Sequence, residues 1–174
     1  MDITNYTKQL SSLNTAKTGT SKAPHKAILL LTVIDLIDWG EIKSNHIKLD
    51  DNLEWQFKHN WSRYVGNSPL FQSKIATPYW HMQGESFWKL ILQDGRETTK
   101  DNFQGSPYSV SNLKKQVRYA AIDQDLFELM QTVDGRAQMR TLLISIYLTY
   151  KPIQKENLLT LLITFGGSLF SIAS

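Results

Sequence analysis

A mostly apolar segment extends from Ala27 to Ile37, interrupted only by Thr32 and Asp35, and directly follows the sequence Pro24-His25-Lys26. It is apolar on nearly every side of a helix, which predicts a buried central helix over residues 24–38 that ends near Gly40. Apolar residues spaced three or four apart predict further helices along the chain. These expected helices cover residues 2–13, 52–64, 111–120, 124–131 and 135–150. Their expected N-caps are Asp50 or Asp51, Asp123 and Asp134.

Two stretches rich in aromatic and β-branched residues predict a β-hairpin, with strands over Lys74 to Met82 and over Ser86 to Leu92. Pro78 has no N–H for a ladder, so the first strand is expected at a sheet edge or with a bulge. A shorter strand is expected over residues 45–49, and polar loops over residues 14–22, 66–73 and 93–110. Together these elements predict an α+β fold, a mostly helical single domain with a small antiparallel β-hairpin or sheet.

Several classes of chemistry find no support in the sequence. There is no cysteine, which excludes disulfides, thiolate metal ligands and a cysteine nucleophile. The four histidines are widely spaced, and no pair has a metal-ligand spacing such as His-x-x-x-His. No Gly-x-Ser-x-Gly elbow, phosphate-binding loop or dinucleotide fingerprint is present. We therefore expect no catalytic residues, no metal site and no cofactor.

Charge and hydropathy place few limits on the partner. A net charge of +3 permits nucleic-acid binding without requiring it. The N-terminus lacks the basic and apolar regions of a signal peptide. Residues 157–174 carry no charged side chain, but Gly166 and Gly167 interrupt them, which makes them a poor membrane span. We expect a cytoplasmic protein with no membrane partner.

His25 and Lys26 are the first candidates for contact with an anion. At the first turn of the central helix they lie beside free backbone N–H groups and the positive end of the helix dipole, which attract an anion such as a DNA phosphate. The alternative is that both are ordinary solvated first-turn residues, and this segment alone favours that alternative.

The segment Thr77-Pro78-Tyr79-Trp80-His81-Met82 is the second candidate. A rigid proline beside two aromatic residues can form a stiff apolar wall at a strand edge, or can simply be a core strand.

Two groups of basic residues are the third candidate for contact with DNA. They are Lys114, Lys115 and Arg118, and Lys58, His59 and Arg63. Such side chains can contact phosphates without recognising sequence, although a solvated helix face explains each group equally well.

Taken together, these segments resemble the DNA sulfur-binding domain found at the front of many bacterial restriction endonucleases of the HNH type. Pro24-His25-Lys26 and the apolar helix after it are similar to the opening helix of that domain. The segments 78–82 and 87–90 are similar to its central hairpin, and residues 113–148 to its closing helices. The resemblance covers roughly residues 5–150.

That family recognises DNA in which sulfur replaces one non-bridging phosphate oxygen. The resemblance implies that Thr77, Pro78 and His81 form an apolar pocket wall, with His25 and Lys26 beside the modified group. Sulfur is larger and more weakly hydrated than oxygen, so an apolar pocket flanked by cations would hold it at a smaller desolvation cost. Loops 66–73 and 102–112 would recognise the neighbouring bases in the major groove. The residues expected to bind DNA are His25, Lys26, Thr77, Pro78, Tyr79, His81, Ser109, Ser111, Lys114, Lys115 and Arg118.

The resemblance further implies a role in bacterial defence, through type IV restriction that depends on phosphorothioate DNA, and a location in the bacterial cytoplasm. No His-Asn-His constellation follows residue 150, so we expect a non-catalytic double-stranded-DNA-binding module rather than a nuclease. The expected division is a sulfur-binding domain over residues 1–150 and a tail or helix over 151–174, with self-association or a nuclease partner possible.

Three alternatives remain open from the sequence. The first is a general or methylation-dependent DNA-binding domain. The second is a protein-interaction domain that pairs through residues 157–174. The third is a hydrolase that uses His25, His81 and an acidic residue from the 94–101 loop.

Overall fold

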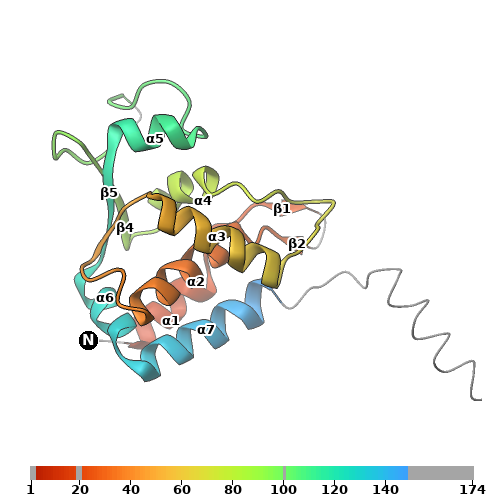
Figure 1. The fold of residues 1–174 in the computed structure, drawn as a ribbon. Coiled ribbons are helices and arrows are strands. Elements are labelled where there is room, and N and C mark those ends of the chain that lie inside the picture. The colour runs from red at the N-terminus through yellow and green to blue at the C-terminus, as the bar shows by residue number, and fades with distance from the viewer. Residues whose placement is uncertain (1–2, 19–20, 100, 149–174) are drawn as a thin grey trace, which may run out of the picture.

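The predicted apolar helix lies at the centre of the fold in a computed structural model that describes residues 3–18, 21–99 and 101–148. This helix, α2 (His25–Asp38), is buried along most of its length, as its all-round apolar sequence predicts. Among the described residues, four helices pack against it: α3 (Asp51–Tyr64), α4 (Ala76–His81), α6 (Gln124–Gln131) and α7 (Val133–Tyr147). The first helix, α1 (Ile3–Ser11), packs on α7 (Figure 1).

A small antiparallel sheet lies to one side of these helices (Figure 1). Its strands are β3 (His46–Ile47), β4 (Trp88–Leu92) and β5 (Val117–Ile122), in the order β3-β5-β4. A second pairing joins β1 (Lys17–Thr18) to β2 (Ser21–Lys22) within the predicted polar loop 14–22. The structure confirms the predicted α+β class, mostly helical with a small antiparallel sheet.

The predicted hairpin over residues 74–92 is wrong in its first half. Residues Ala76–His81 form helix α4, a 3-10 turn η1 (Met82–Gly84) follows, and only the second predicted strand is present, as β4. Pro78 is tolerated in α4 because it lies in the first turn, where backbone N–H groups have no partner within the helix. β4 pairs with β5, which is distant in sequence, so local patterns could not identify its neighbour.

The predicted helix over residues 111–120 is also wrong in part. Helix α5 (Val110–Gln116) ends early, and the chain continues directly as β5 between the other two strands. Val117, Tyr119 and Ile122 are the β-branched and aromatic residues that suit a central strand. The apolar spacing of this segment also fits a helix, but pairing with a strand on each side makes it a strand.

Helix ends follow the predicted caps in part. Asp50 is the N-cap of α3 and accepts from the backbone N–H of Leu53 at 2.9 Å. Gly40 ends α2 with φ +74°, as predicted. Asp134 is not the N-cap of α7, because Thr132, two residues earlier, takes that place and its hydroxyl accepts from the backbone N–H of Gly135. Residues 149–174, which include the end of the last predicted helix and the predicted tail, lie outside the described residues.

Candidate functional site

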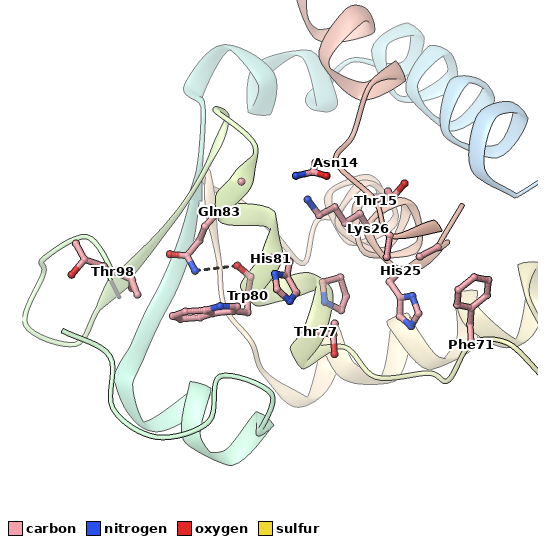
Figure 2. A pocket seen from close by; sticks show the side chains of 15 residues that line it. Asn14, Thr15, His25, Lys26, Phe71, Thr77, Trp80, His81, Gln83 and Thr98 are labelled. Carbon is pink, nitrogen blue, oxygen red and sulfur yellow. Dashed lines mark hydrogen bonds between the residues drawn. The ribbon is translucent and has the colours of Figure 1, made fainter. Parts of the chain in front are cut away.

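A cavity of about 780 Å³ opens between the start of α2, helix α4 and the segment before β1. We call it the α2–α4 pocket. Five residues predicted from the sequence line it: His25, Lys26, Thr77, Pro78 and His81. Its other lining residues are Asn14, Thr15, Ala16, Ala23, Phe71, Trp80, Gln83, Gly84, Thr98 and Thr99. Figure 2 shows His25 and Phe71 toward one end, Trp80 and Gln83 toward the other, and His81 and Thr77 between them.

Helix α4 forms one wall because its residues divide between the pocket and the core. Pro78 and His81 are three residues apart and therefore lie on one side of the helix, and both line the pocket. Tyr79 points the other way: it is fully buried, and its hydroxyl donates to the carbonyl oxygen of Ile47 at 2.8 Å. The prediction that Tyr79 contacts DNA is therefore wrong, since its phenol holds the sheet to α4.

Lys26 is the only predicted cation in the pocket among the described residues, and it is already paired. Its Nζ lies 2.5 Å from Oε1 of Glu85, and the two side chains are only 7% and 10% exposed. The same carboxylate oxygen accepts from the backbone N–H of Asn14 at 3.0 Å. Sequence reasoning placed Glu85 in a hairpin turn and missed this role. A buried lysine needs an acidic partner, and that requirement is the signal that could have found Glu85.

His25 is held in a neutral state by its surroundings. Its Nε2–H donates to the carbonyl oxygen of Gln72 at 2.8 Å, and its ring lies 4.7 Å from Trp61 and 5.8 Å from Phe71. Burial lowers the pKa of His25 below the ordinary histidine value, although the bond to Gln72 opposes this shift. The pocket therefore offers an apolar, uncharged imidazole at neutral pH.

His81 lies at the pocket rim with a lowered pKa as well. Desolvation contributes most to the shift, and the nearby positive charge of Lys26 adds to it. With Lys26 neutralised by Glu85 and both histidines uncharged, the site has apolar walls and little net charge near pH 7.

Both loops predicted to recognise bases lie next to the pocket. Loop 66–73 supplies Phe71 to its lining. The long loop after β4 packs on α4 through two ring pairs, Phe103 with Trp80 at 4.6 Å and Tyr108 with His81 at 5.7 Å. Tyr108 is still 57% exposed, so the rim carries an accessible aromatic ring.

The remaining predicted residues are not brought to the pocket. Ser109 is the N-cap of α5 and accepts from the N–H of Asn112 at 3.3 Å, and Ser111 is exposed on that helix. Lys114 is bound by Asp51 at 2.7 Å and by Glu54. Lys115 and Arg118 are exposed near the same corner of the molecule.

Lys114 and Arg118 line a separate open depression with Asp50 and Asp51. The acidic residues there would oppose a phosphate.

Within residues 3–18, 21–99 and 101–148, no group of three or more His, Asp or Glu side chains could hold a metal ion. In the same part of the chain, no helix has the length and apolar character needed to cross a bilayer. The sequence matches no protein-family model and no curated protein.

Proposed function

We propose that this chain is a non-catalytic module that binds double-stranded DNA carrying a phosphorothioate linkage, with the sulfur in the α2–α4 pocket. One observation carries the proposal. His25 and Lys26 come from one segment of the chain and Thr77, Pro78 and His81 from another, and all five line a single cavity. The resemblance implied that these two segments meet at one site, and their shared cavity supports the proposal.

The electrostatics of the pocket favour a weakly hydrated anion. An ordinary phosphate oxygen is strongly solvated, and a site with little net charge returns little of the hydration energy it loses. Sulfur loses less on entering an apolar site, and the walls at Pro78 and Phe71 give it contact surface. Lys26, although paired with Glu85, lines the pocket and would attract the negative charge of the linkage.

Glu85 would add specificity by repulsion. Its carboxylate shields Lys26 and disfavours any anion whose binding is not helped by apolar contact. Discrimination between two similar ligands commonly uses such an unfavourable element against the wrong one. The pocket would thus recognise sulfur partly by binding ordinary phosphate poorly.

The wider role proposed here follows from the same binding activity. Loops 66–73 and 102–112 flank the pocket and would contact the bases beside the modification. A module of this kind would direct a nuclease partner to modified DNA in bacterial defence, acting in the cytoplasm.

The test is a binding titration near physiological salt with duplexes that carry one phosphorothioate of either stereochemistry, or none. We expect a preference for one modified duplex of at least about tenfold, because an asymmetric pocket distinguishes the two stereoisomers. Pro78→Asp should abolish the preference by placing a negative charge in the wall, whereas Pro78→Ala should keep it.

Other results would select another function. Equal affinity for all three duplexes would favour a general or methylation-dependent DNA-binding domain. Absence of DNA binding together with concentration-dependent association would favour a protein-interaction domain.

A further inference from the structure

Helix α3 carries an unusual solvent-facing side. Leu53, Phe57 and Trp61 are buried against the rest of the protein, while Trp55 on the opposite side is 60% exposed. The outer side of such a helix is normally polar, so a large exposed indole there is a departure that calls for a reason.

Trp55 is part of an ordered stripe. Trp55, His59 and Arg63 are spaced four residues apart and so follow one line along the helix. The rings of Trp55 and His59 are stacked, with centroids 5.5 Å apart and planes 10° apart. Lys58 is exposed beside this line. We call these four residues the α3 stripe.

The charge of the α3 stripe is positive and uncompensated. No acidic residue occurs between Trp55 and Tyr64. Asp51 and Glu54, at the start of the helix, are bound to Lys114. The Arg63 guanidinium lies 5.2 Å from the ring of Tyr64, a contact that leaves its charge intact. In the described part of the chain, no carboxylate forms an ion pair with Lys58 or Arg63.

Trp39 provides a contrast within the same molecule. It is 58% exposed, almost as much as Trp55, but its neighbour Asp38 is paired with Arg136 and Arg140, and the acidic residue Glu41 follows it. Exposure alone therefore does not distinguish the two indoles, whereas the cations Lys58 and Arg63 beside Trp55, which form no ion pair in the described part of the chain, do.

From this arrangement we infer that the α3 stripe binds an unpaired stretch of nucleic acid, with a base stacked on Trp55 and phosphates beside Lys58 and Arg63. Every nucleobase has a π face, so stacking on an indole needs no particular sequence, and neighbouring cations follow the backbone. His59 stacks on the indole of Trp55 and holds it in one orientation. None of the four residues lines the α2–α4 pocket, and the ligand needs no sulfur, so this site goes beyond the proposed function.

The experiment is a fluorescence titration of the full chain with labelled oligothymidine of about eight nucleotides, repeated over a range of salt. Trp55→Ala should weaken binding by roughly five- to hundredfold, as expected for loss of one stacked base. Trp39→Ala is the matched control and should bind as the unchanged protein does. The double change Lys58→Gln with Arg63→Gln should reduce the salt slope by about 1.4, whereas Lys8→Gln with Lys43→Gln should leave it unchanged.

Two results would overturn the inference: no binding of oligothymidine, or binding that Trp55→Ala and Trp39→Ala affect equally. Oligouridine in a parallel titration distinguishes DNA from RNA as the natural source of the strand. The preference for phosphorothioate duplex, measured on the same variants, separates the two proposals. If Trp55→Ala keeps that preference and loses oligothymidine, both stand. If the unchanged protein has no preference but binds oligothymidine through Trp55, only the α3 stripe stands.

Discussion

Each end of helix α2 carries an ion pair with another part of the chain, but the two pairs have different surroundings. At the C-terminal end, Asp35 and Asp38 pair with Arg140, with N–O distances of 2.9 and 3.0 Å. At the N-terminal end, Lys26 pairs with Glu85. Both are ion pairs between α2 and another part of the chain, and in the second Lys26 lines the α2–α4 pocket.

The C-terminal network is closed by side chains from three helices. Asp35 accepts from Gln56 at 3.0 Å and from Asn60 at 2.7 Å on α3, as well as from Arg140 on α7. The acidic charge is thus satisfied from within the fold. The Lys26 ammonium, by contrast, pairs with the carboxylate of Glu85 and borders the α2–α4 pocket, so a ligand anion can compete for it. The Asp35 carboxylate is thus fully engaged by the fold, whereas the Lys26 ammonium lies where a ligand could reach it.

Among these tests, Asp35→Ala should have the largest effect. The change leaves Arg140, Gln56 and Asn60 without their shared acceptor, and we expect a loss of about 3 kcal/mol in the free energy of unfolding. Urea denaturation measures it. Glu97→Ala is the control, since its pair with Lys89 is exposed and should contribute less than about 1 kcal/mol. The phosphorothioate preference should not change, and a loss of preference in folded Asp35→Ala protein would contradict the division between the two ends.

Glu85→Gln tests the opposite end. The amide keeps a hydrogen-bond acceptor for Asn14 but removes the charge that neutralises Lys26, so ordinary duplex should bind about tenfold more tightly. The phosphorothioate preference should shrink accordingly in the same titration. Glu97→Gln has the same charge change outside the pocket and should leave the preference intact. An unaltered preference in Glu85→Gln would mean that the carboxylate takes no part in excluding ordinary phosphate.

A smaller effect is expected from pH. The pKa values of His25 and His81 are both lowered, so the histidines gain protons only as the pH falls below their ordinary value of about 6.5. Their positive charges would then help ordinary phosphate to bind, and the phosphorothioate preference should fall between about pH 7.5 and about pH 5.5. Titrations across this window measure the ratio. The double change His46→Gln with His59→Gln, outside the pocket, should show the same fall, whereas His81→Asn should reduce it.

The same shifts affect stability with a definite sign. A histidine whose folded pKa is lowered binds fewer protons in the folded than in the unfolded chain as the pH falls below about 6.5. The stabilisation from the buried neutral form of His25 is therefore present at neutral pH and is lost in acid. Urea denaturation at the two ends of the window should show this decrease, and His25→Gln should remove part of it.

Local sequence signals predicted what depends on local physics. The all-round apolar run of α2 and the Asp50 cap of α3 were visible because helix burial and capping act within a few residues. The pocket residues at positions 25, 26, 77, 78 and 81 were placed together by a resemblance, and the structure brings them to one cavity.

The failures arose where distant contacts decide. Residues 76–81 form a helix rather than a strand, and β4 pairs instead with β5, far along the chain. Tyr79 was predicted to contact DNA, but within α4 it is fully buried, and Pro78 and His81 line the pocket instead. No local sequence pattern around Glu85 predicts its ion pair with Lys26.

Lys114→Gln should have the smallest effect, although the sequence predicted a phosphate contact for this residue. Its ammonium is held between Asp51 and Glu54 at the surface, so its charge is balanced before any DNA arrives. We expect less than about 1 kcal/mol of lost stability and less than about a twofold change in duplex affinity. Lys115→Gln is the comparison, since its exposed side chain lies one residue along the same helix. If Lys114→Gln instead lowered the affinity for modified and unmodified duplex equally, by roughly tenfold, Lys114 would contact the DNA backbone after all. DNA would then have to displace both carboxylates from its ammonium.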